Sequence, residues 1–239
     1  MEYYYTHRDN IYIDKGLLIF RDSSFKHITK VLRKKRGDII NATDGENNVY
    51  VCEIIKIKKN LIEAEILKNY KDIGEPEKNV TMYICQLKSN DRFEFAIEKA
   101  VEIGVKKIIP VISQNTIVKK KYSSDRIKRF NRIILSAMEQ SQRCYLPLME
   151  ETVTFEEMLN FTNTVKSKIV MYEFEKSSNK IIHSKINNDC VLLLGPEGGF
   201  NKNEINELRI NNWMSFSLGD RKLRSETAAI LSLYEILKT

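Results

Sequence analysis

The sequence is poor in the residues that build metal centres, disulfide frameworks and membrane spans. Its four cysteines, Cys52, Cys85, Cys144 and Cys190, lie far apart, form no C-x-x-C pair, and are accompanied by only three histidines. This spacing argues against zinc motifs and favours cysteines that serve as small core residues. No apolar run approaches the length of a membrane span, and residues 1–10 are too polar and aromatic for a signal peptide. We therefore expect a cytoplasmic protein without a metal site.

Glycine is also scarce, and the nine glycines form no known nucleotide-binding pattern. Gly195, Gly198 and Gly199 are not spaced as G-x-G-x-x-G, and no Lys-Ser/Thr pair follows them as in a Walker loop. The sequence therefore argues against dinucleotide and nucleoside-triphosphate binding. It also contains no internal repeat and no low-complexity tract.

Positive charge is what the chain has in excess. The formal net charge is +7 at pH 7, from 39 Lys and Arg against 32 Asp and Glu. Residues 30–36, KVLRKKR, hold five cations in seven positions, and residues 119–132 hold seven cations against the single acid Asp125. Two such clusters suit phosphate contacts with a polyanion, although a solvated surface explains either cluster equally well.

Residues 1–70 predict a small β-barrel with one helix. Phe25, Ile28 and Val31 or Leu32 recur at helical spacing within residues 23–32, behind a serine cap. Residues 71–79 form a polar stretch with Gly74 and Pro76, which is typical of a linker. The β-prone segments are residues 3–5, 11–13, 38–42, 49–57 and 61–67.

From residue 80 to residue 239, predicted strands alternate with predicted helices. This alternation indicates an α/β domain with a mainly parallel sheet that is covered on both faces. Ligands of such sheets bind beyond the carboxyl ends of the strands. The predicted strands are residues 81–87, 107–112, 168–172, 190–194 and 213–218, and the predicted helices are residues 91–103, 124–138, 203–210 and 225–237.

Two of these strands run into glycine-containing loops. The apolar run that begins at Val191 ends at Gly195, and the strand before Leu218 ends at Gly219 and Asp220. Because glycine lacks a Cβ and reaches positive φ, such loops let backbone groups approach a ligand closely. A plain turn explains one such loop alone, but two together predict a ligand-binding edge.

Several stretches are specific enough to carry a family resemblance. They are RFEFAIEKAVEIGVKKIIPV at 92–111, EQSQRCYLP at 139–147, GPEGGF at 195–200, SLGDRKLRSETAAI at 217–230 and HITKVLR at 27–33. Together they resemble the ribosomal small-subunit methyltransferase E family, which belongs to the SPOUT superfamily of trefoil-knotted methyltransferases. The last stretch resembles the PUA-like RNA-binding domain of that family. Lys222, where an aliphatic residue is usual, and Ser225, where threonine is common, are mild departures.

The resemblance implies a fold, a reaction and a cofactor. The fold is a SPOUT α/β trefoil knot with a small N-terminal PUA-like β-barrel, an exception to the rule that chains do not thread their own loops. The reaction is methyl transfer from S-adenosylmethionine to N3 of a uridine in 16S ribosomal RNA, by a homodimer. A ribose 2′-hydroxyl acceptor, as in other SPOUT enzymes, and a noncatalytic RNA-binding module remain the alternatives.

The resemblance also implies a cofactor site at the two glycine loops. Backbone groups can hydrogen-bond the adenine edge while Leu218 and Leu223 pack against its faces, although a plain core role explains each leucine as well. Glu197 either meets a ribose hydroxyl or accepts hydrogen bonds from loop N–H groups. The predicted cofactor-binding residues are Tyr172, Leu194, Gly195, Pro196, Glu197, Gly198, Gly199, Leu218, Gly219, Leu223, Arg224, Thr227 and Ala228.

A uridine N3 carries a proton at neutral pH, so the reaction calls for a base and for a cation near O2 or O4. Glu226 is the candidate base, unless its charge merely suits a helix N-terminus. Arg224 is the candidate for orientation or charge stabilisation, unless it forms a salt bridge within the knot. Glu98 and Glu102 are weaker candidates for the base.

RNA contacts are predicted at basic residues in both domains. Phosphate contacts would supply affinity, while the fold and a splayed-out base would supply specificity. His27 is equally well explained as an ordinary surface residue. The predicted RNA-binding residues are Arg8, His27, Lys30, Arg33, Lys88, Arg92 and Arg143.

Overall fold

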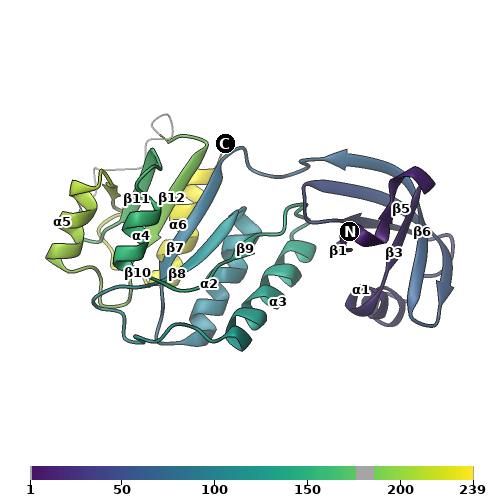
Figure 1. The fold of residues 1–239 in the computed structure, drawn as a ribbon, viewed down its shortest axis with the longest axis horizontal. Helices are drawn as coiled ribbons and strands as arrows, with labels where there is room; N and C mark the ends of the chain where they lie inside the picture. The colour runs from purple at the N-terminus through teal and green to yellow at the C-terminus, as the bar shows by residue number, and fades with distance from the viewer. Residues whose placement is uncertain (1, 176–185, 239) are drawn as a thin grey trace. The chain divides into compact units, whose positions relative to one another are not determined.

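The structure is a computed structural model that describes residues 2–175 and 186–238. The chain divides into two compact units (Figure 1). Unit 1 comprises Met1–Glu75 and Leu135–Leu146, and unit 2 comprises Pro76–Ile134 and Pro147–Thr239. No helix of the described residues is long and apolar enough to cross a bilayer.

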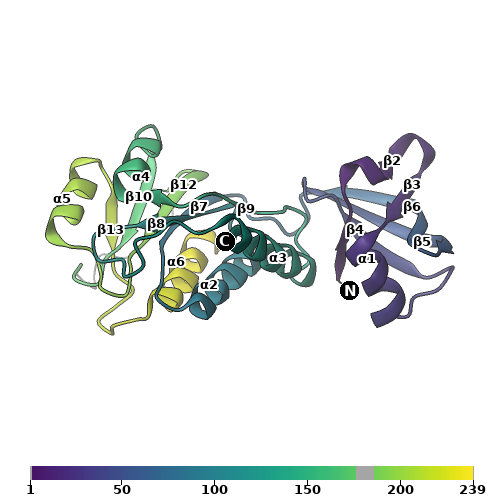
Figure 2. The same cartoon turned by 60° about the horizontal axis from the view of Figure 1, so that its bottom comes forward.

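Unit 1 is built on a curled six-stranded sheet in the order β1-β4-β5-β6-β3-β2 (Figure 2). All its neighbouring strands are antiparallel except β1 and β4. Alternate residues of β5, such as Tyr50, Cys52 and Ile54, face the core with Leu18 and Phe20. The strands are β1 Tyr3–Tyr5, β2 Ile11–Tyr12, β3 Leu17–Phe20, β4 Ile39–Thr43, β5 Asn48–Lys58 and β6 Leu61–Lys71, with two 3₁₀ turns at Arg8–Asn10 and Ile13–Lys15.

The helix predicted for residues 23–32 forms in two parts. An α-helical turn, α1 Asp22–Lys26, continues as a π-helical segment, His27–Val31. Ile28 is fully buried against the sheet, whereas Val31 is exposed. The apolar spacing therefore predicted the burial of Ile28, but it was wrong for Val31 and Leu32, which are both exposed, and it did not predict the change of helical pitch.

The segment Leu135–Leu146 returns to unit 1 after the chain has entered unit 2. Glu75 accepts hydrogen bonds from Arg143 Nη2 at 2.6 Å and from the backbone N–H groups of Cys144 and Tyr145, each at 3.1 Å. Leu146 N donates to Gly45 O, and a Cβ on Gly45 would lie 2.8 Å from Leu146 Cβ. The expectation that residues 80–239 form one continuous domain therefore differs from this division. This segment consists of the last turns of the helix Ser124–Gln140 and the irregular residues 141–146, and local sequence patterns do not report which unit it joins.

Unit 2 is built on an all-parallel sheet with the strand order β10-β8-β7-β12-β11-β13, and β9 pairs with β8. All residues of β11, and all of β12 after its first, are buried, which explains their continuous apolar runs. The strands are β7 Asn79–Cys85, β8 Lys107–Ile112, β9 Leu148–Met149, β10 Val153–Thr154, β11 Ser167–Met171, β12 Asp189–Leu194 and β13 Met214–Phe216.

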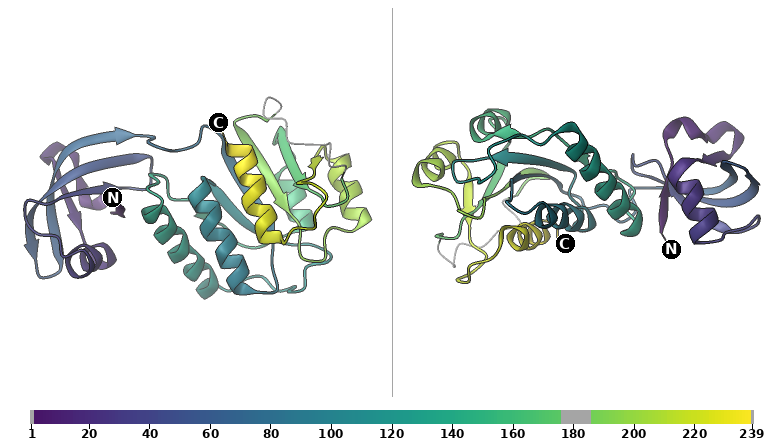
Figure 3. Two further views of the ribbon diagram at one scale, coloured as in Figure 1. Left: turned by 180° about the vertical axis from the view of Figure 1, so that it is seen from behind. Right: turned by 90° about the horizontal axis from the view of Figure 1, so that it is seen from below.

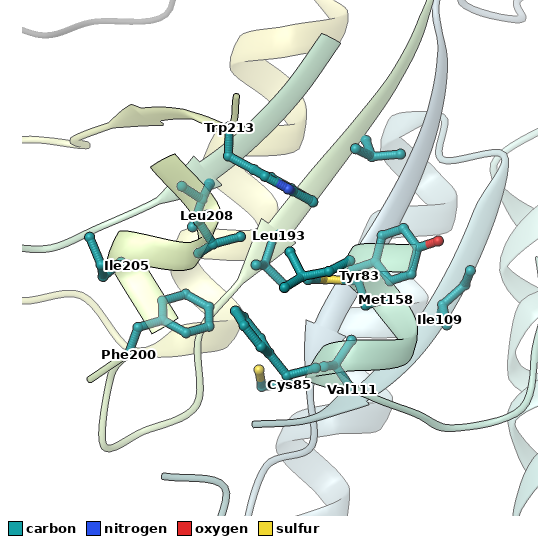
Figure 4. Packing of buried hydrophobic residues seen from close by; sticks show 14 residues of the cluster. Tyr83, Cys85, Ile109, Val111, Met158, Leu193, Phe200, Ile205, Leu208 and Trp213 are labelled. Atoms are coloured by element: carbon teal, nitrogen blue, oxygen red, sulfur yellow. The ribbon is translucent and has the colours of Figure 1, made fainter. Parts of the chain in front are cut away.

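Helices cover both faces of this sheet (Figure 3). α2 and α6 lie side by side on one face, and α4 and α5 lie on the other. Figure 4 shows the packing on the second face, where Met158 of α4 and Leu208 of α5 meet Tyr83 and Leu193 from the sheet. The helices are α2 Asn90–Ile103, α4 Phe155–Phe161, α5 Lys202–Ile210 and α6 Ser225–Leu237, and α3 Ser124–Gln140 belongs to unit 2 up to Ile134 and to unit 1 from Leu135.

The strands and helices predicted after residue 80 are present in the structure, with small shifts at their ends. Helix α4 was not predicted, although Thr154 and Glu157 form a capping box whose T-x-x-E spacing is visible in the sequence. The strand predicted for 213–218 ends at Phe216 because Ser217 and Leu218 turn out of the sheet into a loop. The all-parallel sheet agrees with the fold that the resemblance implies, while the threading of the chain through a knot stays a prediction.

Candidate functional site

A pocket of about 360 Å³ opens at the carboxyl edge of the sheet in unit 2. Strands β12, β11 and β13 are neighbours, so the loops that follow them meet at one edge. The predicted cofactor-binding residues line this pocket, with the exception of Gly198 and Thr227. The other lining residues are Arg92, Met171, Glu173, Phe200, Phe216, Ser217, Arg221, Lys222 and Ser225.

The glycines of the first glycine loop lie close to neighbouring side chains. A Cβ on Gly195 would lie 3.0 Å from the Phe200 ring, and a Cβ on Gly199 would lie 3.1 Å from Glu173 Oε1. Gly199 also has a φ of +66°, a value that favours glycine. Gly198 lies behind the pocket wall, where a Cβ would lie 3.1 Å from Asn115 Cβ. The close packing explains why this loop is rich in glycine.

The loop after β8 supports the first glycine loop from behind. Asn115 Nδ2 donates to the carbonyl oxygen of Gly199 at 3.0 Å. The buried carboxylate of Glu204 accepts from Gln114 N at 2.7 Å and from Asn201 N at 2.9 Å. Sequence reasoning missed these residues, but the N-x-x-E spacing of Asn201 and Glu204 is a capping-box signal that could have found two of them.

The second glycine loop bends through Gly219, whose φ is +108°. Ser217 Oγ accepts a hydrogen bond from Gly219 N at 3.1 Å, which fixes the turn before Leu218 and Leu223 reach the pocket. Lys222 lies 3.4 Å from a carboxylate oxygen of Glu173. Because Lys222 is largely exposed, this ion pair contributes little to stability.

An arginine between two glutamates forms one wall of the pocket. Arg92 Nε and Nη2 bind the two carboxylate oxygens of Glu226 at 2.8 and 2.5 Å. Arg92 Nη1 lies 3.4 Å from Glu197 Oε1, which also accepts from Lys88 N at 3.1 Å. Glu197 Oε2 is buried and has no hydrogen-bond partner among the described residues. An unpaired oxygen beside a pocket is typical of a site that a ligand or water completes.

Glu226, the predicted general base, is only 7% exposed and belongs to the first turn of α6. Burial raises the pKa of its carboxyl, but the hydrogen bonds from Arg92 and the charges of Arg92 and Arg224 outweigh burial, so the net pKa is lowered. A carboxylate with a lowered pKa and two bonded oxygens is a weak base. This placement suits a residue that holds Arg92 better than one that accepts a proton. Arg224 itself is exposed, directly precedes α6 and lines the pocket.

The predicted RNA-binding residues fall into three groups. Arg143 is only 4% exposed and its guanidinium is bonded to Glu75, so the prediction that it contacts phosphate is wrong for this structure. Arg92 lines the pocket in unit 2, and Lys88 is exposed nearby. In unit 1 all four predicted residues are exposed: Arg8, which pairs with Glu46, His27, which lies 3.6 Å from Glu2, Lys30 and Arg33.

The two basic clusters differ in how far acids neutralise them. In residues 119–132, Arg126 and Arg129 both bind Glu94, and Lys119 Nζ binds two backbone carbonyl oxygens. In residues 30–36, no ion pair involves any of the five cations within the part of the chain that the structure describes. The cluster of residues 30–36 therefore retains more unneutralised charge than the cluster of residues 119–132. Among the described residues, no group of His, Cys, Asp or Glu side chains is placed to hold a metal ion.

Comparison with known proteins relates both units to RNA modification. Residues 75–236 match the family model described as an RNA methyltransferase domain, and residues 20–67 match the RNA methyltransferase PUA domain. The chain is 33% identical to ribosomal RNA small subunit methyltransferase E of Mesomycoplasma hyopneumoniae, covering 94% of this chain and 95% of that protein. It is 31% identical to the protein of the same name from Rickettsia conorii, covering 90% and 86%.

A solved structure agrees with these sequence matches. The crystal structure of ribosomal RNA small subunit methyltransferase E from Neisseria gonorrhoeae, bound to S-adenosyl methionine, superposes with a TM-score of 0.85 at 29% identity. The match covers 98% of this chain and 95% of that one. Both parts of the molecule and nearly its whole length are thus shared with one group of enzymes, and the chain belongs to the ribosomal RNA small subunit methyltransferase E family.

Proposed function

We propose that this chain transfers a methyl group from S-adenosylmethionine to N3 of a uridine in 16S ribosomal RNA, and that it works in the cytoplasm as a homodimer. The observation that carries this proposal is the pocket formed by the two glycine loops at the carboxyl edge of the sheet. Its place in the sheet is where parallel α/β folds bind their ligands. The family supplies the reaction, since its members are named as methyltransferases of small-subunit ribosomal RNA.

The residues of the pocket fit S-adenosylmethionine. A volume of about 360 Å³ lies in the usual range for small-molecule sites. The glycines keep the backbone of the first loop open to a ligand, because a Cβ at Gly195 or Gly199 would crowd the pocket wall. Leu218 and Leu223 provide apolar surface, and the unpaired Glu197 Oε2 provides an acceptor for a hydroxyl or ammonium group. When bound, the cofactor supplies an electrophilic methyl group on a sulfonium.

Residues of unit 1 would contribute affinity for RNA. Lys30 and Arg33 are exposed in the cluster of residues 30–36, which lies within the match to the PUA domain. Phosphate contacts of this kind position a nucleic acid without reading its sequence. The target uridine must leave its base stack to reach a pocket in unit 2, as is usual for enzymes that modify bases.

A homodimer is supported by apolar side chains that α2 and α6 leave uncovered. Phe95 of α2 and Leu231 and Tyr234 of α6 are all exposed. The two helices lie next to each other on the same face of the sheet (Figure 3). An exposed apolar surface on adjacent helices is typical of a subunit contact.

The reaction can be tested with labelled S-adenosylmethionine and small ribosomal subunits that lack their methyl groups. After digestion of the RNA, mass spectrometry identifies the labelled nucleoside. Label in 3-methyluridine is the expected result. Label on a ribose would move the acceptor to a 2′-hydroxyl, and failure to bind the cofactor would favour a noncatalytic RNA-binding module.

A further inference from the structure

We infer that Arg92 is the cation that stabilises the acceptor uracil when its N3 loses the proton, and that Glu226 is the positioning residue that holds Arg92 toward the pocket. This inference rests on the proposed methylation of uridine N3. It assigns to Arg92 a role in the reaction in place of the predicted phosphate contact, and it assigns to Glu226 a role other than that of general base.

Arg92 is fixed at both ends of its side chain. Its backbone lies in the first turn of α2, where Arg92 N donates to the N-cap residue Ser89. Its Nε and Nη2 atoms are bonded to Glu226, which comes from α6. A guanidinium carries five N–H groups. The two bonds to Glu226 use one edge of it, so the N–H groups of the other edge can bind another partner. One of these groups makes only the long contact with Glu197.

The remaining donors of Arg92 are available to a ligand in the pocket. Arg92 lines the pocket, and its side chain is 30% exposed, whereas Glu226 is buried behind it. The other cations that line the pocket, Arg221, Lys222 and Arg224, lie on the exposed second loop. Donors held in place before the reaction stabilise developing charge best, because they need no reorganisation.

The chemistry requires such a donor. When the N3–H bond of uracil breaks, the electron pair stays on N3 and its charge spreads to O2 and O4. Arg92 donates a hydrogen bond to one of these oxygens and so makes N3 more acidic. The proton passes to solvent, because both oxygens of Glu226 already accept hydrogen bonds from Arg92. The N3 electron pair then bonds to the methyl carbon as the carbon–sulfur bond breaks, and that bond's electrons remain on sulfur.

The test compares Arg92→Gln and Glu226→Gln with Glu94→Gln. Glu94 is a matched control because it binds Arg129 through two hydrogen bonds of 2.6 and 2.7 Å but does not line the pocket. At saturating RNA, Arg92→Gln should lower the single-turnover methylation rate ~10²- to 10³-fold, the usual cost of removing a donor to a developing anion. Glu226→Gln should lower it ~10-fold because Arg92 is still present but less ordered. Calorimetry with S-adenosylhomocysteine measures any loss of cofactor affinity in either variant separately from the loss of rate, which is determined at saturating cofactor and RNA.

Two readouts separate this role from a merely structural one. The rate of Arg92→Gln should keep rising with pH beyond the point at which the unaltered enzyme levels off. RNA with 5-fluorouridine at the target, whose N3 is more acidic, should restore most of the lost rate. The inference is overturned if Arg92→Gln binds RNA more weakly, with a flatter salt dependence, but keeps its rate at saturating RNA. That result would show that Arg92 contacts a phosphate. A loss of rate that 5-fluorouridine does not restore would also overturn the inference.

The product analysis distinguishes this failure from failure of the proposed function. If the unaltered chain forms 3-methyluridine and Arg92→Gln shows neither readout, only the role of Arg92 is overturned. If the unaltered chain binds cofactor and RNA but methylates another atom, the acceptor assignment falls and the inference falls with it.

Discussion

Replacing Glu75 by glutamine should destabilise unit 1 more than the loss of an exposed ion pair would. Glu75 and Arg143 are each only 4% exposed, and their side chains are 2.6 Å apart. Glu75 also accepts hydrogen bonds from the N–H groups of Cys144 and Tyr145. Glutamine keeps the size of the side chain but removes the negative charge that lies against the buried guanidinium. Removing one partner of a buried pair costs ~3–5 kcal/mol.

Hydrogen exchange followed by mass spectrometry measures this effect locally, which is needed because the two units can open separately. A loss of ~3–5 kcal/mol should speed exchange of the amides of residues 143–146 by ~10²-fold or more, at ~1.4 kcal/mol per factor of ten. Glu150→Gln is the matched control, because Glu150 pairs with Lys107 at 3.1 Å with both side chains well exposed. A loss of less than ~1 kcal/mol for Glu75→Gln, the value expected of an exposed pair, would refute the reasoning.

Further predictions concern the pocket, RNA and pH. Gly199→Ala should weaken cofactor binding ~10-fold in calorimetry. Gly37 also has a positive φ but has open space around it, so Gly37→Ala should not weaken binding. Equal cofactor binding by the two variants would contradict the crowding assigned to Gly199. Neutralising the cations of residues 30–36 should weaken RNA binding and flatten its salt dependence, whereas neutralising Arg126 and Arg129, which both pair with Glu94, should change the salt slope less. Competition binding at several salt concentrations can check this. The pKa of Glu226 is lowered in the folded state, so its pair with Arg92 stabilises the fold above about pH 4.5, and this stability is lost as pH falls through the lowered pKa. Urea denaturation should therefore show a deficit for Glu226→Gln at about pH 7 that shrinks at about pH 3, and an equal deficit at both values would contradict this.

The elements that could be predicted are those whose signal lies within a few neighbouring residues. Strand β8 at Lys107–Ile112 and helix α2 with its end before Gly104 follow directly from apolar spacing and stop signals. The return of residues 135–146 to unit 1 could not be predicted in this way. It depends on Glu75, a residue far away in the chain, and on a buried arginine whose charge made it resemble a surface residue.

The candidate site shows the same limit. The glycine loops could be found from the sequence because glycine itself marks positions where the backbone takes a positive φ or where a Cβ would be crowded. The pairing of Arg92 with Glu226 could not, since nothing in either local stretch indicates that α2 and α6 lie together. Without the structure, Arg92 looks like one of many surface cations and Glu226 like a free carboxylate. Their contact changes the expected role of both.

The position of β12 has a consequence for how unit 2 folds. This late strand lies between β7 and β11, and Asn79 pairs with Asp189 across a large part of the chain. The centre of the sheet therefore forms only after most of the polypeptide has been synthesised, and until then β7 has one unpaired edge and β11 has two. Folds dominated by such distant pairings form slowly. Synthesis rate and chaperones, more than final stability, should therefore set the yield of active protein.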